Sequence, residues 1–359
     1  MSNVVTLNTL HRQSQASRLA RLTALFATQR RIEDDVFWLK ENAEWLGILA
    51  SSDVTLPEDA LAPFEGFYTH ISQRLQFFPQ YYRFFLSLCL DLEDLALAGD
   101  TGRALCDWVA DAGLVEAELS DLQRAEAGRL LARCGVGAAD PALVALLHHF
   151  IDRSDTFALP NKKAAYELTH IVFYLAEYGQ RDPKISKKAV QSLEYTGLLA
   201  YLDQNFDLLA EVCAALRMAG QRPSPIWEHA VKITHADFAL TADADCPSHD
   251  GYHEYLVTGW AASLAGETAF RGDVPDGPVT FERLVTVGPL RALSESLLAL
   301  GDTRSGDWSQ MRGRLMPLLS QDGYEIVARA EGSSDCFEAF FEGFARAVRP
   351  NAVALEVVS

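Results

Sequence analysis

Apolar residues recur every three or four positions along most of the chain. In the segment DLQRAEAGRLLARCG, residues 121–135, the apolar residues follow helical spacing and a glycine comes directly after them, where a helix commonly ends. Strict alternation of apolar and polar residues, which is typical of half-buried strands, is essentially missing from the sequence. The pattern therefore predicts an all-α fold of roughly fourteen to sixteen helices. Further helices are expected in the segments LPEDALAPFEGFYTHISQRLQFF, PQYYRFFLSLCLDLEDLALAG and NFDLLAEVCAALRMAG.

The connections between these helices are short, so neighbouring helices should pack as hairpins. Either a closed α/α toroid-like ring or an irregular helical solenoid would accommodate them, and the poor internal self-similarity disfavours a regular repeat array. The Gly- and Pro-bearing run GETAFRGDVPDGPVT, residues 266–280, is the clearest long loop. We therefore expect a main helical domain at 1–265, this loop, which either separates two parts or forms a lid, and a C-terminal helical extension at 281–359 packed on the same body.

Composition and charge narrow the possible partners and the location. The chain has 359 residues, 49% of them hydrophobic, and a net charge of −18, so its surface should repel nucleic-acid phosphates and anionic lipid headgroups. The N-terminus spaces arginines through polar residues and lacks the apolar stretch of a signal peptide. Six cysteines lie far apart without a C-x-x-C pair, as expected of reduced thiols. We expect a cytoplasmic protein that binds neither nucleic acid nor membranes.

The familiar cofactor and nucleophile motifs are missing from the sequence. It contains no G-x-G-x-x-G, no G-x-x-x-x-G-K-[ST], no G-x-S-x-G and no H-E-x-x-H. This argues against a nucleotide cofactor and against a serine hydrolase.

The segment DADCPSHDGYH, residues 243–253, concentrates side chains that bind metal ions. Cys246, His249, Asp250 and His253 all lie in it, and the two histidines, four residues apart, would share one helix face. A thiolate and two imidazoles form a ligand set suited to Zn(II), Fe(II) or Co(II). The same residue types also occur in a solvated connector that caps a helix, and the segment by itself fits both interpretations.

His170 stands alone in the apolar and aromatic helical run YELTHIVFYLAEYG, residues 166–179. On a helix it shares a side with Tyr166, Tyr174 and Glu177. A buried neutral histidine bonded to one of these is one interpretation. The other is that His170 faces His253 across an internal cavity, since facing helices are where all-α proteins build metal and substrate sites.

The segment DGYHEYLVTGWAASLAG, residues 250–266, resembles part of protein prenyltransferase β-subunits, in which a Tyr-His pair opens a helix and the histidine binds zinc. The resemblance implies a ring of helical hairpins around a funnel, with His253 at the position of the zinc histidine. It covers fewer than twenty residues, and the segment DPKISKKAVQSLEYTG, where the family has its aspartate and cysteine ligands, has no cysteine. The segment ELTHIVFYLAEYG also resembles uncharacterised bacterial helical proteins.

These observations predict a metal-dependent enzyme that acts on a small molecule or peptide inside a helical cavity. The expected cofactor is a divalent metal, Zn or Fe, and Tyr174 and Glu177 are the candidate catalytic side chains beside it. The alternative, from another class, is a non-catalytic helical scaffold that binds a peptide or partner protein. The candidate metal ligands are His170, His253, Cys246, Asp250 and His249.

Overall fold

The predicted all-α class is confirmed. The computed structural model describes residues 13–347 apart from 34, 53, 58, 138, 139, 246 and 248. Within these residues it contains seventeen α-helices and one pair of short antiparallel strands. The strands are four residues long, which is too short for an alternating pattern to be recognised in the sequence.

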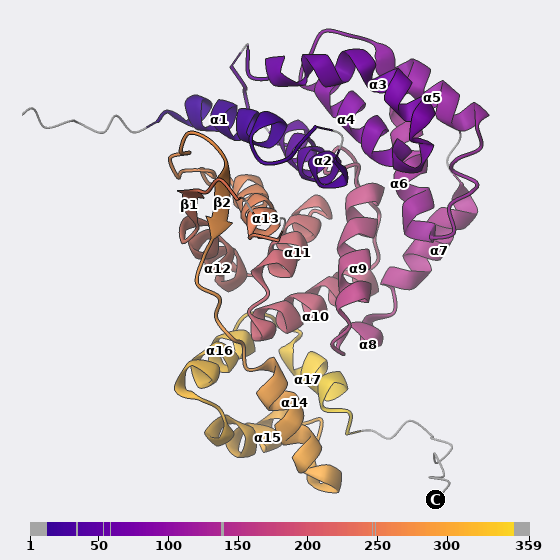
Figure 1. Cartoon of the computed structure of the whole chain (residues 1–359). Helices are drawn as coiled ribbons and strands as arrows, with labels where there is room; N and C mark the ends of the chain where they lie inside the picture. Colours follow the sequence, from indigo (N-terminus) through magenta and orange to yellow (C-terminus); the bar gives the residue numbers. More distant parts are fainter. Residues whose placement is uncertain are drawn as a thin grey trace, which may run out of the picture.

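Six helices close into a ring in the body of the molecule (Figure 1). Each packs on the next along the chain, and the last of them packs back on the first. The members of the ring are α2 (Val36–Ala50), α4 (Tyr82–Asp94), α6 (Asp121–Arg133), α9 (Lys162–Leu175), α11 (Phe206–Met218) and α13 (Tyr252–Leu264).

A second set of helices packs against the outside of the ring. The helices of the ring are therefore covered on most sides, and their apolar residues are not confined to one stripe. In α11, for example, every residue except Asp207 and Arg217 is buried. The outer helices are α1 (Gln15–Thr28), α3 (Glu65–Phe77), α5 (Thr101–Asp111), α7 (Pro141–Ile151), α8 (Ser154–Phe157), α10 (Lys187–Asp203) and α12 (Pro225–Ala236), with short 3-10 turns at Ala62–Phe64 and Pro79–Tyr81.

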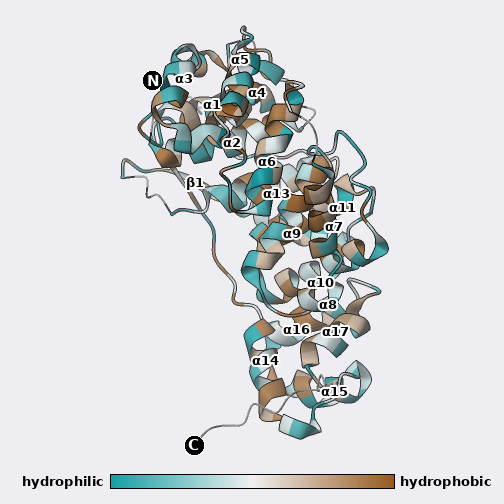
Figure 2. Cartoon of the chain, turned by 90° about the vertical axis from the view of Figure 1, so that its right-hand side faces the viewer, coloured by the Kyte–Doolittle hydropathy of each residue, from teal (hydrophilic) through white to brown (hydrophobic). Residues whose placement is uncertain are grey.

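Four further helices form a C-terminal lobe beneath the ring (Figure 2). An extended segment connects the ring to the lobe, and α10 carries the contacts between them. A hydrogen bond of 3.0 Å from Trp227 Nε1 to Ser333 Oγ adds a buried polar link. The lobe comprises α14 (Leu290–Ala299), α15 (Trp308–Leu315), α16 (Gln321–Glu331) and α17 (Phe337–Ala345), with 3-10 turns at Gly301–Thr303 and Met316–Leu318.

The long loop expected at 266–280 is anchored to the ring. Its end enters strand β2 (Val279–Glu282), which pairs antiparallel with β1 (Ala239–Ala242). Phe270 is buried, and its backbone carbonyl accepts a hydrogen bond of 2.9 Å from Arg18 Nε of α1. Its backbone N–H donates to Nε2 of the buried His235, and burial lowers the pKa of this histidine to about 4. The loop is thus held from both sides by buried contacts.

A buried arginine ties the start of the ring to its end. The Arg30 side chain, just after α1, is fully buried and donates to Glu41 of α2 at 2.9 Å and to both oxygens of Asp250 at 2.8 and 2.9 Å. Asp250 lies two residues before α13 and also accepts from the Phe281 backbone N–H of β2. The guanidinium lies over the rings of Tyr252 and Phe281. The Arg30 guanidinium therefore connects helix α2, the start of helix α13 and strand β2 through buried hydrogen bonds.

We expect Asp250→Asn to destabilise the protein by about 3–5 kcal/mol, because the substitution leaves the buried Arg30 charge without one of its two carboxylate partners. Asp276→Asn is the matched control. It removes the partner of Arg21 in an exposed ion pair, and such pairs contribute about 0–1 kcal/mol. Denaturant unfolding followed by circular dichroism measures both values. Equal, small effects of the two substitutions would contradict the role assigned to Arg30.

Candidate functional site

The ring encloses a pocket of about 140 Å³. All six helices of the ring contribute to its wall, and α2, α4 and α6 do so mainly with residues from their C-terminal halves. The carbonyl end of a helix carries partial negative charge, so these helices add a negative potential near the pocket. Each helix of the ring also places at least one ionisable side chain in the wall; these residues are Glu44, Asp91, Asp94, Arg129, Arg133, His170, Glu211 and His253.

His253, in the first turn of α13, is held by an aspartate from α11. Its Nδ1 lies 2.7 Å from Asp207 Oδ1, and Tyr166 of α9 donates its hydroxyl proton to Asp207 Oδ2 at 2.6 Å. Asp207 therefore accepts from two directions, which fixes both the carboxylate and the imidazole ring. A carboxylate at Nδ1 leaves Nε2 as the ring nitrogen that can face a ligand.

A glutamate from across the ring faces that nitrogen. Glu44 Oε1 of α2 lies 3.7 Å from His253 Nε2. Burial alone would lower the pKa of His253, but the carboxylates of Glu44 and Asp207 outweigh this and raise it to about 10. Burial raises the pKa of Glu44 above its usual range, and the imidazolium partly offsets this. His253 is thus a fixed cation at neutral pH.

His170 forms a second imidazole–carboxylate pair in the same pocket. Its Nδ1 donates to the Tyr166 carbonyl oxygen one turn earlier, at 2.8 Å, and lies 3.6 Å from Glu211 Oε2. Glu211 is buried in α11, and its Oε2 is hydrogen-bonded to the Thr169 hydroxyl. Burial raises the pKa of the Glu211 carboxyl, with His170 acting in the opposite direction. Because Nδ1 carries a proton in this bond, Nε2 is the nitrogen of His170 that can accept one.

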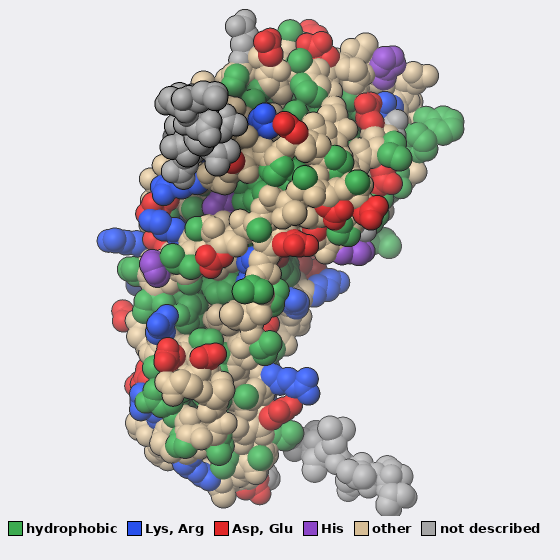
Figure 3. Space-filling view, turned by 60° about the vertical axis from the view of Figure 1, so that its left-hand side comes forward, with side chains coloured by type: hydrophobic (Ala, Val, Ile, Leu, Met, Phe, Trp, Pro, Cys, Tyr) green, Lys and Arg blue, Asp and Glu red, His purple; other side chains and the backbone are tan. Residues whose placement is uncertain are grey.

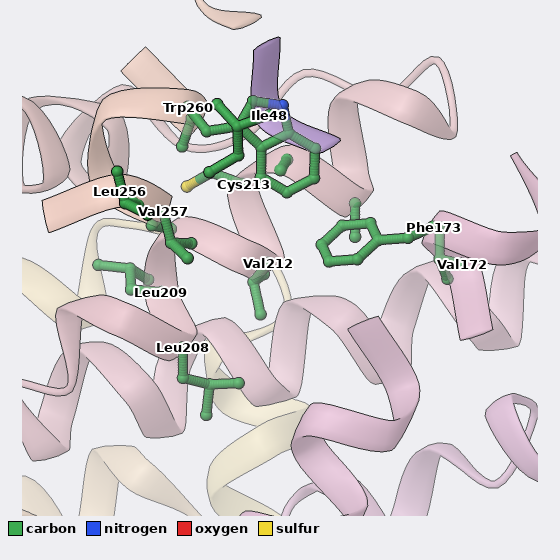
Figure 4. Packing of buried hydrophobic residues seen from close by; sticks show 14 of the residues in the cluster. Ile48, Val172, Phe173, Leu208, Leu209, Val212, Cys213, Leu256, Val257 and Trp260 are labelled. Atoms are coloured by element: carbon green, nitrogen blue, oxygen red, sulfur yellow. The ribbon is translucent and has the colours of Figure 1, made fainter. Parts of the chain in front are cut away.

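Aromatic side chains line the pocket beside the histidines. Phe173 of α9 and Trp260 of α13 point toward each other with ring centroids 5.1 Å apart (Figure 4), and Ile48 of α2 lines the same pocket. The Tyr178 ring, just beyond α9, stacks on Phe173 at 5.9 Å and lies 6.0 Å from Trp260. Together these residues form an apolar, largely aromatic wall next to the charged groups.

Two arginines of α6 occupy the end of the pocket away from the histidines. Arg129 lies over the Tyr178 ring at 4.9 Å and forms an ion pair of 3.3 Å with Glu177. Arg133 forms ion pairs of 2.8 Å with Asp91 and with Asp94 of α4. The charges at this end are therefore balanced by direct pairing.

The structure brings some of the predicted site residues together. His170 and His253 line the same pocket, as we expected, and Glu177 lies in its wall. Tyr174 is buried behind His170, with ring centroids 6.1 Å apart, and does not reach the pocket wall. Glu177 is engaged by Arg129 and by Arg181, at 3.4 Å.

The rest of the predicted ligand set lies elsewhere or cannot be placed. Both oxygens of Asp250 accept hydrogen bonds from Arg30, so this carboxylate holds the ring closed and is not directed at the pocket. His249 is exposed and packs edge-on against Phe37. Cys246 lies outside the described residues. In the part of the chain that is described, no three His, Cys, Asp or Glu side chains are arranged to hold a metal ion. The metal itself stays a prediction.

Sequence reasoning missed the acidic half of the site. Asp207 and Glu211 lie four residues apart in the otherwise apolar run NFDLLAEVCAALRMAG, and Glu44 lies in the similarly apolar run VFWLKENAEWLGILA. Acidic residues in a helix that is apolar on most sides must be buried, and buried carboxylates need partners. That signal was present in the sequence, but the partners come from other helices and only the fold reveals them.

The comparisons identify the family of the chain. The family described as Domain of unknown function (DUF6902) matches residues 1–347, and the chain belongs to this family. No curated protein and no solved structure matches the chain.

The surface and the helix lengths bear on the expected partners. None of the described helices is long and apolar enough to cross a membrane. On the face drawn in Figure 3, lysine and arginine side chains are interspersed with acidic ones, and no broad basic area is visible there.

We expect stability to fall as the pH rises from about 7 to 10, because His253 must lose its proton. The folded-state pKa of about 10 exceeds the value of about 6.5 for an unfolded histidine. The stabilisation is therefore complete below pH ~6.5 and is lost as the pH rises through the folded-state pKa. Thermal unfolding of wild type and His253→Gln across this range measures the difference. His70→Gln, at an exposed histidine, should behave like wild type. Parallel curves for wild type and His253→Gln would contradict the assignment.

Proposed function

We propose that the protein is an enzyme that acts on a small molecule inside the helical ring by general acid–base chemistry. The observation that carries the proposal is the convergence of two imidazoles, the buried Glu211 and the half-buried Glu44, from four different helices, on one side of a single pocket. Catalytic sites cluster such groups, because neighbouring charges and burial set their pKa values for proton transfer.

His170 is suited to accept a proton from the substrate. The hydrogen bond from its Nδ1 to the Tyr166 carbonyl fixes the tautomer and leaves Nε2 free to act as a base. Glu211, 3.6 Å away, is placed to stabilise the imidazolium formed when His170 takes up the proton.

Glu44 and His253 are suited to donate a proton to the substrate and to stabilise its negative charge. Burial raises the pKa of the Glu44 carboxyl, so this group can take up a proton during the reaction and return it to another atom of the substrate. The His253 cation, held by Asp207, can stabilise negative charge that develops while the proton is in transit. The reaction class is proton abstraction and return, as in isomerisation, elimination or hydrolysis.

We expect His170→Gln and Glu44→Gln each to lower turnover by about 10²–10⁴-fold, the usual contribution of a positioned acid or base. The measurement incubates the purified protein with a fractionated pool of cellular small molecules and follows depletion and product formation by mass spectrometry. His70→Gln provides the matched control, since His70 is an exposed histidine outside the pocket. A wild-type protein that converts no compound, or variants that convert it equally well, would contradict the proposal.

A metal-dependent enzyme is the second candidate, and the hydrogen bond between His253 and Asp207 favours it. A metal-binding histidine usually donates its other ring N–H to a carboxylate, as His253 does to Asp207. The candidate ligands are then His253 Nε2 and, with some movement, Glu44 and the Nε2 of His170. We expect metal analysis of protein purified without a histidine tag to separate the candidates. Bound Zn or Fe that is lost in both His253→Ala and His170→Ala would support a metal centre, whereas metal-free protein with full turnover would exclude it.

A scaffold role remains the alternative from a different class. The extended segment before α14 exposes apolar side chains to solvent, with Leu284 93% and Val287 92% exposed, and such residues can contact a partner. A scaffold predicts no turnover and no effect of His170→Gln, so the turnover experiment distinguishes it from an enzyme.

A further inference from the structure

We infer that the pocket binds a small molecule that carries an amine at one end and a hydrogen-bond acceptor, such as a carboxylate, at the other. This inference rests on the proposed function of the pocket and specifies its substrate class. Three features support it: the distribution of charge, the aromatic wall and two buried donors that have no partner.

The histidine end of the pocket has an excess of acid. Glu44, Asp207 and Glu211 surround a single permanent cation, His253, with His170 as the second imidazole. Burial raises the pKa of both Glu44 and Glu211, and a further positive charge beside them would favour their carboxylate forms. An ammonium group would supply the missing charge there.

The opposite end offers donors. Among the described residues, Trp260 Nε1 and Arg129 Nε are buried and have no hydrogen-bond partner. Trp260 is only 4% exposed and the Arg129 side chain only 10% exposed, and both lie in the pocket wall. A buried unpaired N–H costs about 1–3 kcal/mol, so an acceptor on the ligand would be favoured at this end. The other guanidinium there, Arg133, is already paired with two aspartates.

The separation of the two ends sets the length of the ligand. Trp260 follows His253 by seven residues on the same helix, which is a rise of about 10 Å. The rings of Phe173 and Trp260 lie between the ends and would contact a short aliphatic or flat body. A volume of about 140 Å³ is below the range of about 300–1,000 Å³ typical of drug-sized ligands. The ligand is therefore small, with its amine and its acceptor several bonds apart.

Binding of matched probes tests this inference. Calorimetry on the chelator-treated full chain compares 5-aminopentanoate, pentylamine and pentanoate, which share one carbon chain and differ in their charged groups. We expect 5-aminopentanoate to bind most tightly, pentylamine about tenfold more weakly, and pentanoate not measurably. Pentanoate binding as tightly as the amines, or no binding by any probe at millimolar concentration, would overturn the inference.

Substitutions separate the two ends. Glu211→Gln and Glu44→Gln should each weaken both amines about tenfold or more, whereas Trp260→Phe, which keeps the ring and removes the N–H, should weaken 5-aminopentanoate alone. Glu325→Gln, at an exposed glutamate of the C-terminal lobe, is the control and should change nothing. Unchanged affinity of the two pocket glutamate variants, with helical content intact by circular dichroism, would also overturn the inference.

The outcomes for ligand class and for catalysis are distinguishable. His170→Gln should keep amine binding while losing turnover. Amine binding without any turnover would contradict the proposed enzymatic function and support the proposed class of ligand. Turnover confined to compounds without an amine would contradict the proposed class of ligand and support the proposed enzymatic function.

Discussion

The buried charge of Arg30 is the constraint on which the pocket depends. A ring of helices has an inside only if its last member meets its first, and here that seam joins α13 to α2. Arg30 bonds to Glu41 within α2 and to Asp250 just before α13. Removing one partner of a buried ion pair is far more costly than opening an exposed pair, so the seam resists separation.

The contact between α13 and α2 also places the ionisable side chains of the pocket. Glu44 lies one turn after Glu41, and His253 lies three residues after Asp250, so the two sides fixed by Arg30 also carry the facing carboxylate and imidazole. Asp207, from the neighbouring helix α11, then holds the far nitrogen of the imidazole. The distance between Glu44 and His253 is therefore a consequence of ring closure rather than of a flexible loop, which is how active-site groups are kept in position.

The two ends of the pocket differ in how completely their carboxylates are paired with cations. At the arginine end every carboxylate meets a guanidinium, whereas at the histidine end three carboxylates meet one fixed cation. Ion pairs that serve stability alone are expected to be mutually satisfied, as around Arg30. The imbalance beside His253 is what distinguishes a site from a structural network.

The sequence predicted local features well and long-range ones poorly. Helical periodicity yielded the all-α class, and the isolation of His170 and His253 on apolar helices pointed to a shared cavity, because facing helices are where all-α proteins build such sites. The same reasoning assigned Asp250 to a metal, since nothing local reveals that Arg30, 220 residues earlier, occupies both of its oxygens. The roles of Asp207 and Glu211 were also not evident from the sequence, because their partners lie on other helices, α9 and α13.

The protonation state of His253 tests the account most directly. Nitrogen NMR of selectively labelled histidine reports on each imidazole separately, and a pH titration of wild type and Glu44→Gln would follow the two pocket histidines in the folded protein. We expect that His253 stays an imidazolium through neutral pH, titrates near pH 10, and titrates at lower pH once Glu44 is replaced by a neutral glutamine. A His253 that loses its proton near the ordinary value of about 6.5 in both proteins would contradict it.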